Sequence, residues 1–143
     1  MVSLSGLPPQ GQILEIGCGT GQTTEPFAHR GYRVLCIELG ERLAAVARSK
    51  LAAHSQVVVR TGAFEDWPGE EGAFDLTVSA EAFHWINQTN AYRKIARRLR
   101  PEGALTLFWN RHVQGEGFFE TAHEVNRREA RELFKEHQLE LPR

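Results

Sequence analysis

The sequence predicts an α/β fold in which helices cover both faces of a mainly parallel sheet, and two features lead to this prediction. Short apolar runs rich in β-branched residues alternate with stretches of helical periodicity, which is typical of successive βαβ units. The first run passes into the loop "GCGTG" at residues 17–21. A bare loop between a strand and a helix is a common place for an open α/β sheet to bind a nucleotide-like ligand.

The first half of the chain reads as three strands separated by two helices. The runs "QILEIG", "YRVLCIEL" and "QVVVRT" predict strands over 12–17, 32–39 and 56–61. A helix is expected over about 22–30, with Pro26 tolerated in its first turn and Gly31 ending it. A second helix is expected over about 41–53. Its apolar stripe is expected to be Leu43, Val46, Ala47 and Leu51.

The second half continues the alternation after the turn-rich segment "WPGEEG". "FDLTVSA" predicts a strand over 74–80, and "ALTLFWN" predicts one over 104–110. Between them a helix is expected over about 88–100, ended by Pro101 and Gly103. A last amphipathic helix is expected over about 118–137, and residues 1–143 read as one domain with its core in 12–111. The stripe of the 88–100 helix is expected to be Tyr92, Ile95, Ala96 and Leu99.

Composition narrows the function classes. The 143 residues are 41% hydrophobic, which is enough for a core, and 17 basic against 18 acidic residues give a net charge of -1. No global charge draws the chain to nucleic acid or anionic lipid, and no run is long enough to span a membrane, so a cytoplasmic protein is expected. Cys18 and Cys36 are expected to be packing residues rather than a disulfide framework or a metal site. The basic cluster at 93–100 reads as solvated surface.

The spacing of the loop glycines separates two classes of cofactor. A dinucleotide fingerprint, G-x-G-x-x-G, would place its third glycine where Gln22 stands, whereas this loop reads G-x-G-x-G. A nicotinamide-dependent oxidoreductase is therefore disfavoured. Glu38 ends the second predicted strand, where a carboxylate can accept hydrogen bonds from two ribose hydroxyls, although a solvated strand-end carboxylate is the simpler alternative.

Four blocks resemble the class I S-adenosylmethionine-dependent methyltransferases, in the family's order: "LEIGCGTG", "CIELG", "FDLTVSAEAFHWI" and "ARRLRPEGALTLFWN". They cover roughly residues 12–111, and "AFHWI" and "RRLRPEG" most resemble the branch that methylates small molecules. The resemblance implies a Rossmann-like three-layer sandwich with strand order 3-2-1-4-5. It also implies that the two further strands of the family are missing here, so the last predicted strand would have an open edge. The C-terminal helix could cover that edge, or the chain could be a truncated product, but cover from a homodimer or another partner is the preferred expectation.

The resemblance also implies a set of cofactor contacts. Glu15 and the 17–21 loop would surround the methionyl end of S-adenosylmethionine, Glu38 would take the ribose, and Leu39 would flank the adenine. Many relatives carry an acidic residue for the adenine amino group where this chain has Ala63. The backbone of Ala63 and Phe64 is therefore expected to bind the edge of the base, and the Phe64 ring to pack on it. Glu65 or Asp66 would substitute for the missing carboxylate. The implied cofactor-binding residues are Glu15, Gly17, Cys18, Gly19, Gly21, Glu38, Leu39, Ala63, Phe64, Ser79 and Ala80.

The expected function is methyl transfer to a small-molecule acceptor, and the alternative is a cofactor-binding module without a complete acceptor site. The sulfonium already activates the methyl group, so the protein mainly aligns the acceptor and excludes water. A hydroxyl, acidic carbon or ammonium acceptor needs a base, and His84 and Glu81 are the candidates. Each also has a simpler interpretation: His84 as a structural or pocket-wall residue, and Glu81 as an ion-pair partner of nearby arginines. Trp85 and Trp109 read as core or pocket wall.

Overall fold

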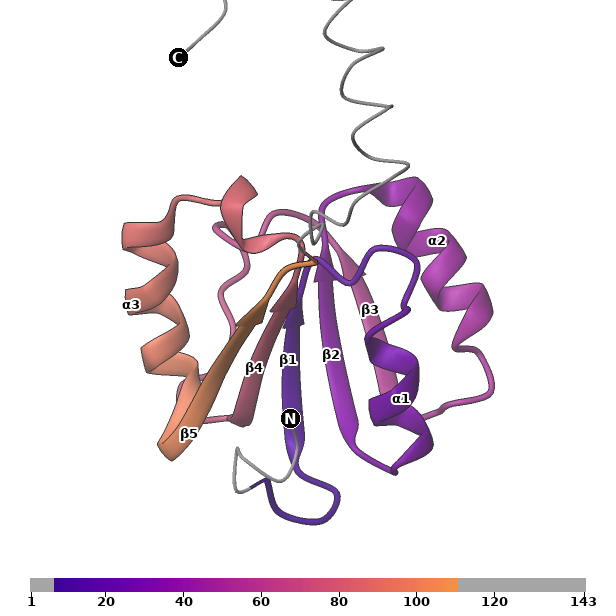
Figure 1. The fold of residues 1–143 in the computed structure, drawn as a ribbon, viewed down its shortest axis with the longest axis horizontal. Coiled ribbons are helices and arrows are strands. Elements are labelled where there is room, and N and C mark those ends of the chain that lie inside the picture. Colours follow the sequence, from indigo (N-terminus) through magenta and orange to yellow (C-terminus); the bar gives the residue numbers. More distant parts are fainter. Residues whose placement is uncertain (1–6, 111–143) are drawn as a thin grey trace, which may run out of the picture. The chain divides into compact units, whose positions relative to one another are not determined.

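The computed structural model describes residues 7–110, and five strands in that part of the chain form one sheet (Figure 1). The sheet order is β3-β2-β1-β4-β5, and every pairing is parallel. This confirms the strand order that the resemblance implied. The strands are β1 (Gln12–Ile16), β2 (Arg33–Glu38), β3 (Val57–Thr61), β4 (Phe74–Ala80) and β5 (Leu99–Phe108).

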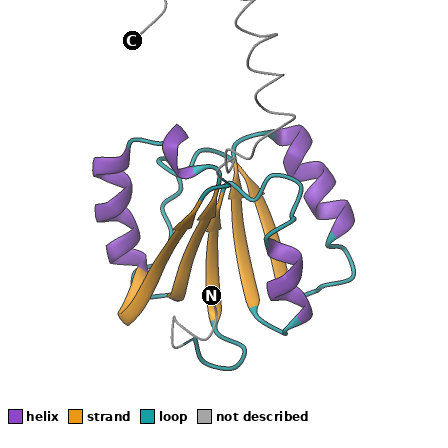
Figure 2. Ribbon diagram, in the orientation of Figure 1, coloured by secondary structure: helices purple, strands orange, loops and turns teal. Residues whose placement is uncertain are grey.

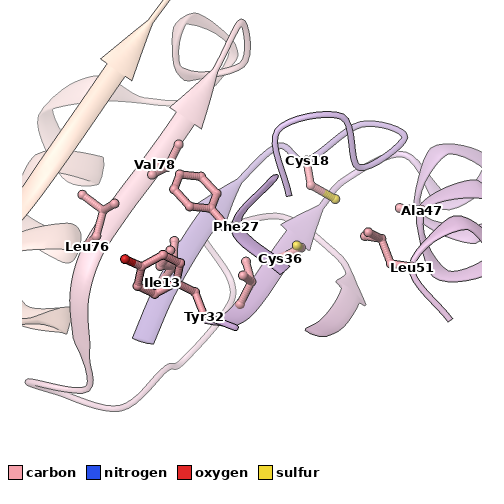
Figure 3. Packing of buried hydrophobic residues seen from close by; sticks show 10 residues of the cluster. Ile13, Cys18, Phe27, Tyr32, Cys36, Ala47, Leu51, Leu76 and Val78 are labelled. Atoms are coloured by element: carbon pink, nitrogen blue, oxygen red, sulfur yellow. The ribbon is translucent and has the colours of Figure 1, made fainter. Parts of the chain in front are cut away.

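Helices cover both faces of the sheet. On one face α1 (Thr24–His29) and α2 (Glu41–Lys50) pack in a cluster that contains Ile13 and Val34 of the strands (Figure 3). On the other face α3 (Gln88–Arg98) packs in a cluster that contains Leu14 and Ile16. Since neighbouring residues of one strand serve both clusters, the central strands read as continuous apolar runs. The expected three-layer sandwich is confirmed.

The buried faces of two helices agree with the predicted stripes only in part, since Ala47, Leu51 and Ile95 are buried as predicted and other members are not. Leu43 and Val46 of α2 are exposed, and Ala44 and Ala47 are the residues of that helix that are buried against the sheet. In the same way, Ala91 and Ile95 of α3 are buried, whereas Tyr92 is 48% exposed. The prediction gave weight to large apolar side chains, but the small alanine side chains are the ones that let each helix approach the strands closely.

The chain leaves α3 earlier than predicted. The helix ends at Arg98, and β5 begins at Leu99, which pairs with Phe74. The next paired residues are Leu76 and Ala104, so residues 100–103 form an irregularity in the ladder, and regular pairing covers 104–108 as expected. Among the described residues no strand pairs with the outer edge of β5. The proposal that a second copy or a partner covers this edge stays a prediction.

The basic cluster is less solvated than predicted, because two of its members bind the segment before β4 and a third binds a carboxylate at the start of β4. Lys94 Nζ donates to the carbonyl of Glu65 at 2.7 Å, and the Arg98 guanidinium donates to the carbonyl of Pro68. Arg100 forms an ion pair of 2.7 Å with Asp75. Within residues 7–110 no helix has the length and apolar character that crossing a membrane requires. The predicted helix over 118–137 lies outside the described residues.

Candidate functional site

A cleft of about 850 Å³ opens at the carboxyl ends of the strands. All five strands point toward this end of the sheet, and the loops that leave β1, β2, β3 and β4 gather there (Figure 2). The volume of the cleft lies in the range found for small-molecule and cofactor sites. The predicted site residues that line it are Gly17, Cys18, Gly19, Glu38, Leu39, Ala63, Phe64, Ala80 and Glu81.

Glu38 is held in a fixed orientation at the end of β2. Its Oε2 accepts the backbone N–H of Gly19 at 2.8 Å, and its Oε1 accepts that of Gly40 at 2.8 Å. The side chain is only 7% exposed, yet it lines the cleft. A Cβ on Gly40 would approach Oε1 to 3.1 Å, so the glycine leaves room for the carboxylate. Each carboxylate oxygen can accept more than one hydrogen bond, so both keep capacity for a ligand.

The three loop glycines lack side chains for two different reasons. A Cβ on Gly17 would lie 2.3 Å from the Cβ of Ala82, and one on Gly21 would lie 2.9 Å from a methyl carbon of Leu51. These two glycines therefore make room for other parts of the protein. A Cβ on Gly19 would meet nothing within 4 Å, so the space beside this residue is open to a ligand. Gly21 does not line the cleft.

Glu15 lies beneath the loop rather than on the cleft wall. The side chain is fully buried, and its Oε2 accepts the hydroxyl of Thr24 at 2.7 Å. Among the described residues no donor reaches its Oε1. Burial raises the pKa of this carboxyl from 4.5 to about 7, against the lowering effect of the bonds from Thr24 and Cys36. Such an unpaired buried polar atom costs about 1–3 kcal/mol.

Ser79 and Ala80 end β4, and only Ala80 lines the cleft. Ser79 is buried, and its hydroxyl donates to the carbonyl of Ile16 at 2.8 Å. This bond ties the carboxyl end of β1 to that of β4, immediately before the glycine loop begins. Ser79 therefore fixes the floor of the site without facing the cleft.

The segment after β3 lines the cleft, and the Phe64 ring within it is buried in the core. Phe64 is 3% exposed and packs against Trp67, with a ring-to-ring distance of 6.2 Å. Lys94 Nζ lies 5.1 Å from the centre of the Phe64 ring and also donates a hydrogen bond to the carbonyl of Glu65. The ring is therefore committed to packing. Ala63 and Glu65 line the cleft beside it, whereas Asp66 does not.

The structure separates the two candidate bases. Glu81 lines the cleft, and its carboxylate accepts the backbone N–H of Asn110. Its φ of 56° is left-handed, a conformation that costs a non-glycine residue of order 1–3 kcal/mol and is often found at functional sites. His84 does not line the cleft, and its Nδ1 accepts the indole N–H of Trp109 at 3.3 Å. Trp85 lines the cleft and is 81% exposed, so it is a wall residue and not a core residue.

Several wall residues were absent from the sequence-based site. Leu43 was placed in the core stripe of its helix, but it is exposed beside Leu39 and lines the cleft. The sequence could not separate this leucine from a core residue, because only the structure shows that its side chain is exposed. No signal was available for the residues contributed by distant or irregular segments, because their approach depends on the tertiary fold. The further wall residues are Ile16, Thr20, Gln22, Thr23, Ile37, Gly40, Gly62, Ala82, Ile86, Phe108 and Asn110.

Comparison with known proteins gives consistent results. A family model described as a methyltransferase domain matches residues 14–107. An uncharacterized methyltransferase of Mycobacterium tuberculosis is 33% identical over 99 residues, which are 69% of this chain and 40% of that protein. A malonyl-acyl-carrier-protein O-methyltransferase of Serratia marcescens is 29% identical over 108 residues, 76% of this chain and 41% of that protein.

A solved structure shares the fold. The S-adenosylmethionine-dependent methyltransferase of Mesorhizobium loti has a TM-score of 0.62 at 25% identity, over 73% of this chain and 49% of that chain. The chain spans about 40% of the length of the curated relatives it matches. The family match covers more than half of the chain. It includes the glycine loop, Glu38 and all five strands except the first two residues of β1 and the last residue of β5. The chain belongs to the class I S-adenosylmethionine-dependent methyltransferases.

Proposed function

We propose that this protein binds S-adenosylmethionine in the cleft and transfers its methyl group to a small-molecule acceptor. The observation that carries the proposal is the Glu38 carboxylate, which two backbone N–H groups orient on the cleft wall with acceptor capacity to spare. A vicinal diol offers two hydroxyl donors at the spacing of one carboxylate. A ribose at this position is therefore well matched by the residues present.

The rest of the cofactor follows from the residues on either side of Glu38. Leu39 and Leu43 are exposed apolar side chains that can cover one face of the adenine, and the backbone at Ala63 can meet the edge of the base. On the other side, the open space beside Gly19 suits the amino-acid tail, because a side chain there would fill it. These contacts leave the methyl group facing the end of β4.

The bound cofactor supplies a methyl group that its sulfonium has already activated. The protein's task is to orient the acceptor and exclude water. Trp85, Ile86 and Phe108 provide an apolar wall for the acceptor, and Glu81 is the carboxylate on that wall. We propose that Glu81, rather than His84, takes the proton from an acceptor that must lose one, since only Glu81 lines the cleft.

Calorimetric titration with S-adenosylmethionine, S-adenosylhomocysteine and NAD tests the cofactor assignment. Both sulfur compounds are expected to bind and NAD is not. Glu38→Gln keeps the shape but removes the charge from the hydrogen bonds to the ribose, so we expect affinity to fall by roughly 10- to 100-fold. Glu41→Gln, an exposed carboxylate at the start of α2, is the matched control. Equal affinity in the Glu38 variant would remove the basis of the proposal.

Transfer of a radiolabelled methyl group to metabolites in a cell extract tests the reaction. Incorporation that disappears in the Glu38 variant supports an enzyme, whereas tight binding without any incorporation supports a cofactor-binding module. Glu81→Gln and His84→Gln are then compared on the labelled product. Loss of transfer in the His84 variant alone would show that the assignment of the base is wrong.

A further inference from the structure

The charged side chains that the structure describes on the cleft wall are all carboxylates. They are Glu38, Glu65 and Glu81, and no lysine, arginine or histidine within residues 7–110 lines the cleft. The ion pairs in this part of the chain involve other acidic residues, so the arginine partner suggested for Glu81 is not found there. The cleft therefore presents negative charge to a molecule that binds beside the cofactor.

The three carboxylates differ in their surroundings. Glu38 is held by the two backbone N–H groups that orient it toward the proposed ribose. Glu65 has a cation close by, because Lys94 Nζ donates to its backbone carbonyl. Glu81 directly follows β4, toward whose end the methyl group would face, and its carboxylate accepts the backbone N–H of Asn110. Glu81 is therefore the carboxylate that is best placed to meet an acceptor.

The cleft wall also carries an exposed aromatic ring. Trp85 lines the cleft, and its side chain is 81% exposed. The face of an indole ring attracts a cation, because the π system carries negative charge there. A carboxylate and an exposed indole on one wall therefore favour a positively charged group and disfavour an anion.

We propose, resting on the proposed function, that the acceptor is a primary or secondary amine without a carboxylate or phosphate of its own, which Glu81 and Trp85 select by its charge. The amine enters as an ammonium ion, and its proton passes to the Glu81 carboxylate. The nitrogen electron pair then forms the new N–C bond while the C–S bond breaks and leaves its electrons on sulfur. The positive charge thus moves to nitrogen, and the Glu81 proton is released to solvent.

Electrostatics separate an amine from the other acceptor classes. Positive charge develops on the attacking nitrogen of an amine, and a fixed carboxylate nearby stabilises it. A carboxylate acceptor, or a hydroxyl that has lost its proton, attacks as an anion, so the same wall would oppose its desolvation and binding. An arginine or lysine commonly binds such an anion, and the described part of the cleft wall has neither.

Fractionation of the metabolite extract by ion exchange at pH 7 tests the acceptor class. Radiolabel from S-adenosylmethionine should enter the fraction that a cation exchanger retains, and the labelled product should be retained as well. Acetylation of the amines in the extract with an N-hydroxysuccinimide ester, followed by hydroxylamine to free the hydroxyls, should abolish incorporation. Glu81→Gln should lower incorporation by roughly 100-fold. Glu41→Gln, an exposed carboxylate outside the cleft, should leave it unchanged.

Fluorescence quenching of the protein without any ligand measures the charge of the wall independently of activity. The emission that is lost in Trp85→Phe is assigned to Trp85. At pH 8 caesium should quench this emission more strongly than iodide does, with each ion compared with its effect on N-acetyltryptophanamide. In Glu81→Gln the preference for caesium should decrease, because one negative charge of the wall is gone.

The outcomes distinguish this inference from the proposed function. Stronger quenching by iodide, incorporation that survives acetylation of the amines, or a labelled product that alkali hydrolyses to methanol would overturn the amine assignment and leave methyl transfer intact. Binding of both sulfur compounds without any incorporation would overturn methyl transfer and the amine assignment together.

Discussion

At the scale of single residues, the glycine loop shows that similar residues in one motif serve different purposes. The absence of a side chain at Gly17 leaves room for Ala82, and its absence at Gly21 leaves room for Leu51, so both positions serve packing inside the protein. Only Gly19 faces open space on the cleft wall. The motif is thus partly a packing feature, and only one of its glycines is a direct test of ligand binding.

Alanine substitutions at Gly17 and Gly19 should therefore differ in how far they affect folding and how far they affect binding. Gly17→Ala forces two Cβ atoms together in a left-handed conformation, and we expect a loss of about 3 kcal/mol in the free energy of unfolding. Gly19→Ala should lose only about 1–2 kcal/mol, for its left-handed backbone, but at least roughly tenfold in cofactor affinity. Urea unfolding and calorimetric titration measure the two quantities.

The double variant Gly17→Ala, Ala82→Gly provides the control. It removes the atom that the new methyl group would strike, so most of the overlap cost should be recovered while the backbone cost remains. If the two substitutions were simply additive, the contact with Ala82 would not be the reason why Gly17 is bare.

At the scale of helices and strands, the sequence predicted the order of elements better than their faces. The strands were found because their β-branched runs are continuous, and 74–80 was placed without error. The faces of α2 and α3 were predicted in part: Ala47 and Ile95 are buried as expected. Ala44 and Ala91 lie against the sheet in place of the larger Leu43 and Tyr92. The 3₁₀ turn at Phe83–Trp85 and the irregularity in β5 were missed, since both depend on contacts between distant segments.

The edge strand β3 has a built-in cover. Arg48 of α2 donates from Nε to the carbonyl of Val59 at 3.1 Å, and its guanidinium also reaches the hydroxyl of Thr61. The outer side of an edge strand is a template for pairing with another chain, and a charged side chain bound there opposes it. α2 thus protects the strand that follows it.

Arg48→Ala should remove this protection. We expect a loss of about 1 kcal/mol in the free energy of unfolding and a greater tendency to aggregate, because an edge carbonyl becomes available. Arg42→Ala, on the same helix and exposed, is the matched control. Light scattering on warming, together with chemical unfolding, measures both effects. Indistinguishable behaviour of the two variants would contradict the role of Arg48.

At the scale of the whole molecule, Glu15 should impose a pH dependence on folding. Below about pH 4.5 the folded and unfolded chains both hold the proton, so the titration of this group adds no cost to folding. Between about 4.5 and 7 the unfolded chain releases the proton while the folded protein keeps it, so stability falls as pH rises. The accumulated cost is about 3 kcal/mol and stays constant at higher pH.

Comparison with Glu15→Gln isolates this contribution. The variant lacks the ionisable group, so its stability should exceed that of the natural sequence increasingly between pH 4.5 and 7, and by a constant margin above it. Guanidinium unfolding across this range measures the difference. Parallel profiles for the two proteins would show that the carboxyl titrates normally in the folded state.

The candidate site was predictable where it lies within one continuous segment. Glu38 and the loop were identified because a strand end and its following residues are local features of the chain. Other features of the site could not be predicted, because they are decided by segments that the fold brings together. They are the burial of Glu15, the burial of the Phe64 ring, and the presence of Phe108 and Asn110 on the cleft wall.

The close approach of Gly17 to Ala82 has a consequence for biosynthesis. A ribosome assembles this chain from its amino terminus, so the loop is polymerised long before the residue that packs against it. The hydroxyl of Ser79 and its acceptor at Ile16 are separated in the same way. A nascent chain halted at about residue 70 would carry the glycine loop and Glu38 yet lack both constraints. Competence to capture a nucleoside should thus arise late in translation, after β4 has emerged and docked.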